Sequence, residues 1–269
     1  MPKVIFLQTT VHGVNRNKKP ALKPFRLMEY VFASCDHFIE LRSDRRCSTD
    51  PCVVGGLAKV GRQSVVVLAY GEGDETIRPI YAGASCLTSN GFRKVFRLLE
   101  MAEKFRYPVL IYSALTLSIS RRSRQSPQEA LQCIGQIHKM WQLQVPIVFV
   151  ALGDWTYQGL FSLWVADRVL ASRDGCVYLP CRRKEFAMEK LFVKTEGLDC
   201  PGIFDLVEPE PFKRTPATTA MMGHALRRHI SQVLDTLLLL SPDQLVAERE
   251  AKVSRLSDSL ENCQGGEIS

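Results

Sequence analysis

The chain has 269 residues, of which 46% are hydrophobic, and it carries a formal net charge of +7. This length is sufficient for one large α/β domain with a continuous core. No stretch approaches the roughly 20 apolar residues that span a bilayer, and the first residues lack the shape of a signal peptide. These features argue against a membrane protein and predict a cytoplasmic one, or a plastid stromal one if the source is a plant or alga.

The nine cysteines and five histidines show no pattern that is typical of a metal site. Two cysteine pairs, Cys47 with Cys52 and Cys176 with Cys181, have four intervening residues but no further Cys or His at metal-ligand spacing. An odd number of cysteines dispersed through apolar segments also argues against a disulfide framework. We therefore expect reduced thiols and no metal in this chain.

Basic residues gather in three clusters, within 42–46, 121–124 and 182–184. Such clusters attract nucleic acid, a phosphorylated cofactor such as CoA, or an acidic carrier protein, and they also occur as plain solvated faces. No helix-turn-helix, zinc finger or aromatic-interleaved strand pair accompanies them, which disfavours nucleic acid as the partner.

Residues 1–22 are polar after the opening positions, and we expect them to form a flexible leader. Two Val-rich runs, 52–60 and 63–70, flank a short turn and predict a hairpin or two neighbouring strands. After a glycine-bearing loop, Asn90 predicts the cap of an amphipathic helix that ends before Pro108.

Strand and helix then alternate along the chain. The apolar runs 109–112 and 147–152 predict buried strands, and residues 126–129 (Ser-Pro-Gln-Glu) form a capping box that predicts the start of a helix between them. Residues 157–166 favour a further short helix. This rhythm is typical of an α/β fold with right-handed crossovers.

The last third of the chain favours two helices, over about 218–240 and 242–256, followed by a flexible tail at 257–269. Four consecutive leucines at 237–240 are too apolar for a free surface, so we expect them to pack on the core or on a partner subunit. The pattern predicts one domain over residues 23–256 and no second domain.

Ordered motifs along nearly the whole chain resemble a known family. They are Lys23-Pro24-Phe25 with Tyr30, Asp44-Arg45, Val54-Gly55-Gly56-Leu57-Ala58, Asn90-Gly91-Phe92-Arg93-Lys94 with Arg97-Leu98, Met101-Ala102-Glu103-Lys104-Phe105, Pro108, Val145-Pro146, Val165, Asp167-Arg168-Val169 and Glu208-Pro209-Glu210-Pro211. In order and spacing the chain resembles the carboxyltransferase α subunit of bacterial and plastid acetyl-CoA carboxylase, over residues 23–256.

The resemblance implies an α/β fold of the crotonase-like (ClpP/crotonase) class, with mixed sheets, packed helices and a C-terminal helical region. It also implies a reaction in which homologous α and β subunits move a carboxyl group from carboxybiotin to a CoA thioester. The implied partners are a β-type subunit or a second copy of this chain, together with a biotin carboxyl carrier or an acyl carrier protein.

The resemblance places an oxyanion site in residues 153–159, where the family has a glycine-rich turn. Only the first and last glycines remain, but a backbone N–H persists at Gly153, Trp155 and Thr156, and such groups stabilise oxyanions. The bulky side chains of Trp155 and Thr156 would crowd a thioester or biotin, although Trp155 is also interpretable as a core aromatic. Asp154 is a candidate general acid or base, or a helix N-cap.

Four further residues are candidates for cofactor binding. Gly55 and Gly56 would allow close approach of a ligand to the backbone, or they are turn or packing glycines. Arg121 and Arg122 would attract the phosphates of CoA. In the segment 114–121 every glycine and proline of the family's corresponding loop is replaced.

These departures leave three hypotheses for the function. The chain is an active carboxyltransferase subunit, or a catalytically inactive subunit that stabilises or regulates a β-type partner. The third hypothesis is a repurposed decarboxylase or hydratase in a biosynthetic pathway, with its chemistry on Asp154, Thr156, Tyr157 or Ser113.

Overall fold

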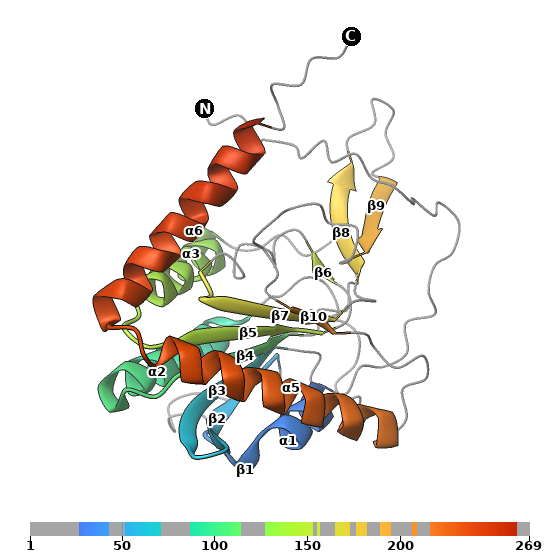
Figure 1. Ribbon diagram of the computed structural model, residues 1–269. Helices are drawn as coiled ribbons and strands as arrows, with labels where there is room; N and C mark the ends of the chain where they lie inside the picture. The colour runs from blue at the N-terminus through green and yellow to red at the C-terminus, as the bar shows by residue number, and fades with distance from the viewer. Residues whose placement is uncertain are drawn as a thin grey trace.

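A seven-stranded sheet forms the centre of the molecule (Figure 1), in the strand order β1-β2-β3-β4-β5-β7-β10. The computed structural model describes residues 27–42, 50, 52–70, 87–113, 127–152, 155–156, 165–172, 176–181, 189–194, 206–208 and 216–262. The strands are β1 (Asp36–Glu40), β2 (Val53–Val60), β3 (Gln63–Tyr70), β4 (Val109–Ser113), β5 (Ile147–Ala151), β7 (Arg168–Ser172) and β10 (Leu206–Glu208).

The sheet is mixed, with an antiparallel part and a parallel part. β2 and β3 form the predicted hairpin, and Gly61 in its turn has a φ of 59°, which glycine adopts without strain. β1 also pairs antiparallel with β2. From β3 onward the pairs β3–β4, β4–β5, β5–β7 and β7–β10 are all parallel, so these strands end at the same edge of the sheet.

Helices cover both faces of the sheet (Figure 1). Helices α2 (Ser89–Phe105) and α3 (Pro127–Trp141) share one core with Val66 and Leu68 of β3. Helices α1 (Leu27–Ser34) and α5 (Pro216–Leu237) share the other core with Val65 and Val67. Burial on both faces explains why the strands read as continuous apolar runs rather than as alternating patterns.

The first turn of α2 corrects one expectation. The helix is capped at Thr88 and begins at Ser89, so Asn90 lies inside the first turn rather than at the cap. The buried carboxylate of Asp50 accepts hydrogen bonds from the backbone N–H and the hydroxyl of Thr88, both at 2.7 Å. A carboxylate from a distant segment therefore fixes the start of this helix, which local sequence could not reveal.

Several strands carry no strong local signal and were missed. They are β1, β7 and β10 of the main sheet and the strands of a second sheet, in which β8 (Cys176–Cys181) lies between β6 (Trp155–Thr156) and β9 (Glu189–Lys194). In Figure 1 this second sheet stands beside the β7 and β10 side of the main sheet. The predicted helix at 157–166 falls outside the described residues except for Val165 and Ala166, which are not helical.

The C-terminal helices extend further than expected. Helix α6 runs over Pro242–Asn262 and so includes the first residues of the segment predicted to be a tail. In the leucine run, Leu237 is buried and Leu240 packs on the α1–α5 core, whereas Leu239 is exposed. Among the described helices, none combines the length and apolarity needed to cross a membrane.

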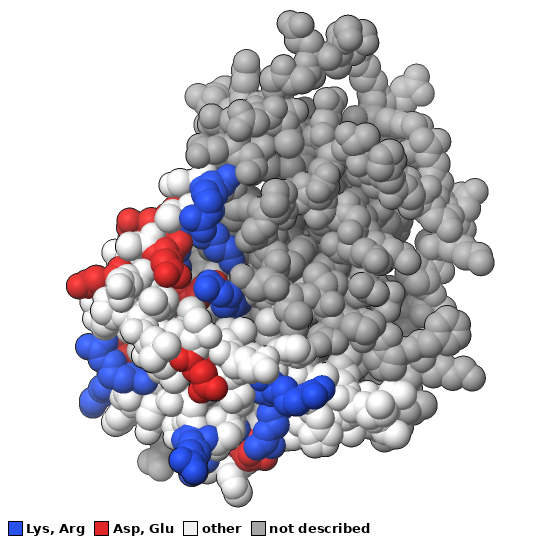
Figure 2. Space-filling model, in the orientation of Figure 1, with Lys and Arg blue, Asp and Glu red and all other residues white. Residues whose placement is uncertain are grey.

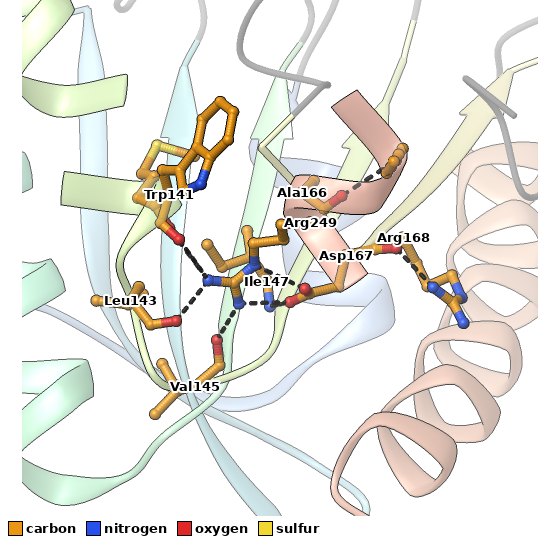
Figure 3. A network of polar contacts seen from close by, with 10 residues as sticks. Trp141, Leu143, Val145, Ile147, Ala166, Asp167, Arg168 and Arg249 are labelled. Carbon is orange, nitrogen blue, oxygen red and sulfur yellow. Dashed lines mark hydrogen bonds and ion pairs between the residues drawn. The ribbon is translucent and has the colours of Figure 1, made fainter. Parts of the chain in front are cut away.

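Arg249 of α6 is fully buried and lies at the centre of a polar network (Figure 3). Its Nε and Nη2 atoms each donate a hydrogen bond of 2.7 Å to the carboxylate of Asp167. The guanidinium also donates to backbone carbonyl oxygens at the end of α3 and in the connection to β5, namely those of Met140, Trp141, Leu143 and Val145. One side chain therefore satisfies carbonyl groups that the end of α3 leaves unpaired.

Asp167 holds the other side of this network. Its Oδ2 accepts a hydrogen bond of 2.6 Å from the backbone N–H of Ile147, the first residue of β5. Burial raises the pKa of the Asp167 carboxyl, and the hydrogen bonds and charge of Arg249 oppose that rise. Lys252, one turn further along α6, donates to the carbonyl oxygen of Ala166. Together these bonds fasten α6 to the starts of β5 and β7.

We expect Arg249→Met to lower the free energy of unfolding by about 3–5 kcal/mol, because it leaves the buried Asp167 carboxylate and several carbonyl groups without their partner. Urea unfolding of the full chain measures the change. Arg228→Met, at an exposed position of α5, is the matched control and should change stability by no more than about 0.5 kcal/mol. Equal effects of the two substitutions would contradict the assigned role of Arg249.

Candidate functional site

The carboxyl ends of the parallel strands mark the candidate site. Tyr70 of β3 pairs with Ser113 of β4, and Ser113 pairs with Ala151 of β5, so the three strands end side by side. In open α/β sheets ligands bind outside the carboxyl ends of the strands. The segment predicted to hold the oxyanion site follows Ala151 and therefore leaves the sheet at this edge.

Two helices begin after strands that end at this edge. α2 follows β3 and α3 follows β4 in the chain, so the first turn of each helix is reached from the carboxyl end of its strand. Helix N-termini carry unpaired N–H groups and a positive dipole end, which favour anions. At the start of α2 the protein itself supplies an anion, the carboxylate of Asp50, which accepts the two hydrogen bonds from Thr88 described above.

Side chains join β3, α2 and α3 near the same edge. The Nε2 of Gln136 donates a hydrogen bond of 2.9 Å to the hydroxyl of Tyr70, and the hydroxyl of Ser89 lies 3.2 Å from the Oε1 of Gln132. Burial raises the pKa of Tyr70, so this phenol stays neutral at physiological pH and can donate but cannot act as a base. The side chain of Ser113, a candidate in one hypothesis, is only 2% exposed.

Of the four residues predicted to be catalytic, the structure describes two. Gly153 and Asp154 lie outside the described residues. Trp155 and Thr156 form β6, which pairs in parallel with Val177 and Tyr178 of β8. In a strand, successive residues direct their backbone N–H groups to opposite sides, so this pairing engages the N–H of one of the two residues and leaves the other directed away from β8. The oxyanion role of this segment stays a prediction.

The candidate glycines lie inside β2 and contact other parts of the scaffold. A Cβ on Gly55 would lie 2.4 Å from Cδ1 of Leu98 in α2, and one on Gly56 would lie 2.1 Å from the carbonyl oxygen of Ile39 in β1. The described contacts therefore give these glycines a packing role. Their predicted role in ligand binding stays a prediction, and the other two candidates, Arg121 and Arg122, lie outside the described residues.

Sequence reasoning missed Asp50, Tyr70 and Gln136 as residues near this edge. Tyr70 could have been found, because it ends a strongly predicted strand and the last residue of a parallel strand lies at the functional edge. Asp50 and Gln136 carry no local signal, since their partners are distant in sequence. Cys35 and Cys133 are not joined in disulfides.

The described residues hold no cluster of three or more His, Cys, Asp or Glu side chains suited to a metal ion. On the face shown in Figure 2, basic and acidic side chains of the described residues are interspersed rather than separated by sign. This face therefore offers neither a metal site nor a broad single-sign patch within the described part.

Comparison with known sequences gives one consistent result. Residues 14–257 match the family described as acetyl co-enzyme A carboxylase carboxyltransferase-like. The chain is 28% identical over 237 residues to the acetyl-coenzyme A carboxylase carboxyl transferase subunit alpha of Prochlorococcus marinus (strain MIT 9303), covering 84% of this chain and 72% of that protein. It is 29% identical over 252 residues to the same subunit of Chlorobium phaeovibrioides, covering 87% and 75%.

Comparison with solved structures concerns the fold. The transcarboxylase 12S structure with methylmalonyl-coenzyme A bound superposes with a TM-score of 0.55 at 17% identity, covering 86% of this chain and 47% of that one. The enoyl-CoA hydratase of Mycobacterium smegmatis superposes with a TM-score of 0.50 at 13% identity, covering 82% and 93%. The chain thus spans about half of the transcarboxylase, and the predicted crotonase-like fold is confirmed.

We expect Gly56→Ala to lower the free energy of unfolding by about 2–3 kcal/mol, because its Cβ would meet the backbone of β1, which cannot rotate away. Gly61→Ala is the control for a glycine with space around it. It should cost about 1 kcal/mol through backbone strain alone. Chemical denaturation of both variants tests whether Gly56→Ala lowers the free energy of unfolding more than Gly61→Ala does. A Gly56→Ala protein as stable as the unsubstituted chain would argue against the packing role.

Proposed function

Because the chain belongs to the acetyl-CoA carboxylase carboxyltransferase-like family, we propose that it is an α-type carboxyltransferase subunit that works beside a β-type subunit. The match over residues 14–257 carries this proposal, since it includes every described strand and all helices except the last turn of α6. The substrates would be a CoA or acyl-carrier thioester and carboxybiotin on a biotin carboxyl carrier protein, and the product a malonyl-type thioester. This reaction suits the cytoplasm or a plastid stroma.

The proposed chemistry needs donors aimed at oxygen atoms on which negative charge develops. Carboxyl transfer breaks the bond between a biotin nitrogen and the carboxyl carbon and joins that carbon to the α carbon of the acyl group. The α carbon gives up a proton, the biotin ureido group takes one up, and negative charge accumulates transiently on the ureido and thioester oxygens. Backbone N–H groups fixed in a water-poor site stabilise such charge by several kcal/mol. In our proposal Gly153, Trp155 and Thr156 supply these groups, and Asp154 is the candidate for proton transfer or capping.

A second candidate function is a catalytically inactive subunit that stabilises a β-type partner. The pairing of Trp155 and Thr156 with β8 favours this alternative, because it takes up backbone groups where the family has a glycine-rich turn. The scaffold contacts around Gly55, Gly56 and Asp167 are the same under either hypothesis. Only an activity measurement separates the two.

We expect this chain, co-purified with a β-type subunit, to transfer carboxyl groups between malonyl-CoA and free biotin faster than the β-type subunit alone. The double substitution Trp155→Gly and Thr156→Gly should raise that rate on the order of tenfold, because the resemblance implies glycines at these positions, where a bulky side chain would crowd the reacting groups. Gly61→Ala, at the opposite edge of the sheet, is the control and should leave the rate unchanged.

The outcomes discriminate between the candidate functions. Turnover above that of the β-type subunit alone supports the α-type carboxyltransferase. A stable complex without turnover in either form contradicts it and supports the inactive subunit. Failure to form any complex with a β-type subunit contradicts both proposals.

A further inference from the structure

The outward face of α3 carries two large apolar side chains in contact with solvent. Leu131 is 68% exposed and Ile134 is 63% exposed. Residues three or four positions apart lie on the same side of a helix, so these two share one face with Gly135 and His138. Ile137, which follows Ile134 by three positions, is partly buried and packs against the core. The apolar surface of α3 therefore extends from the core onto the exposed face.

This α3 face lacks formal charge at its described positions. The exposed positions of α3 and of the residue that follows it are Gln128, Leu131, Ile134, His138 and Gln142, and none of them is Asp, Glu, Lys or Arg. Charged residues make up 23% of the chain, and the solvent side of a helix is where they ordinarily gather. Exposed apolar groups without charge are typical of the centre of a protein–protein interface.

A charge that borders this face is paired within the chain. The Nζ of Lys139 lies 2.6 Å from Oε2 of Glu103, which holds this cation against α2. A partner that brought charged side chains onto the α3 face would remove them from water without offering them an opposite charge. The face therefore fits a partner surface that is also apolar and uncharged, and a second copy of this chain presents such a surface.

Gly135 gives the face a notch at its centre. Among the described residues outside the helix backbone, a Cβ on Gly135 would have only the Cζ of Phe96 within 4 Å, at 3.5 Å, so a side chain from outside can enter the space above it. Two α3 helices can run antiparallel about a two-fold axis between positions 134 and 135. Each Ile134 then faces the partner's Gly135, and each Leu131 faces the partner's His138.

We propose that the α3 face binds a second copy of this chain through an antiparallel, two-fold contact between the two α3 helices. In such a contact the same surface serves both copies, and each favourable pair occurs twice. Ile134 fills the notch over the partner's Gly135, and the small residue allows the helix axes to approach to ~8 Å. The inference goes beyond the proposed function and does not depend on it, because pairing of two copies requires no substrate.

The size of α3 sets the expected strength of this contact. The helix has 15 residues, which corresponds to a length of about 22 Å. Specific stable interfaces bury roughly 800 Å² on each partner, and one helix face supplies less than that. We therefore expect a reversible dimer with a dissociation constant on the order of 10 μM.

Sedimentation equilibrium of the full chain over about 1–100 μM tests the proposal, since this range brackets the expected dissociation constant. We expect Leu131→Glu and Ile134→Glu each to weaken dimer formation on the order of a hundredfold, because the two-fold contact buries the added carboxylate twice. Met221→Glu is the matched control and should leave dimer formation unchanged. Met221 is 72% exposed on α5, on the other face of the sheet, and receives the same charge.

A cross-link tests the antiparallel arrangement separately. Gly135→Cys places a thiol beside the proposed axis in both copies, within reach of a disulfide between them. Mild oxidation should convert this variant to a covalent dimer. Ser254→Cys, at an exposed position of α6, and the unsubstituted chain with its native cysteines should remain largely uncross-linked. Urea unfolding of each variant verifies that the fold is retained.

The proposal is overturned if the unsubstituted chain is monomeric throughout this concentration range, if Leu131→Glu and Ile134→Glu associate as tightly as that chain, or if Met221→Glu weakens association equally. A dimer without the Gly135→Cys cross-link overturns the antiparallel arrangement. If the chain alone is monomeric and Ile134→Glu abolishes its complex with a β-type subunit, the pairing of two copies is overturned and the face belongs to that subunit.

Discussion

The buried ion pair between Arg249 and Asp167 links segments that are far apart in sequence and sets how they meet. Arg249 brings α6 onto the end of α3, and Asp167 brings the start of β7 onto the first residue of β5, Ile147. Each charge depends on the other, because a buried charge without a partner has lost its hydration and gains no ion pair or hydrogen bond to compensate for that loss. The pair therefore fixes the position of β5, which ends at the edge of the sheet where the candidate site lies.

The parallel half of the sheet is a second constraint, because it determines where the segments after the strands emerge. Since β3, β4 and β5 run in one direction, the segments that leave them emerge at one edge, and α2 and α3 begin from those segments. A site of this kind tolerates extensive change in its loops while the sheet below it is retained.

Many of the residues that carry the family resemblance have structural roles in the scaffold. Gly55 and Gly56 admit α2 and β1 close to β2, Lys94 anchors α2 to β1 and β2, and Asp167 holds Arg249. These contacts explain why the motifs persist in a chain whose candidate oxyanion segment is rewritten. Family membership thus establishes the fold and the α-subunit likeness.

The sequence by itself determined the α/β class, the β2–β3 hairpin, the apolar strands β4 and β5 and the helices α2 and α3, because long apolar runs and helical periodicity are local signals. Ordered motifs added the family and its crotonase-like fold. Only the tertiary structure decided the strands β1, β7 and β10, the start of α2 at Thr88 with its bonds to Asp50, and the contact between Arg97 and the backbone of Arg42. These features depend on partners that are tens of residues away in the sequence. Contacts between such distant residues produce no periodic pattern that could be recognised in the sequence.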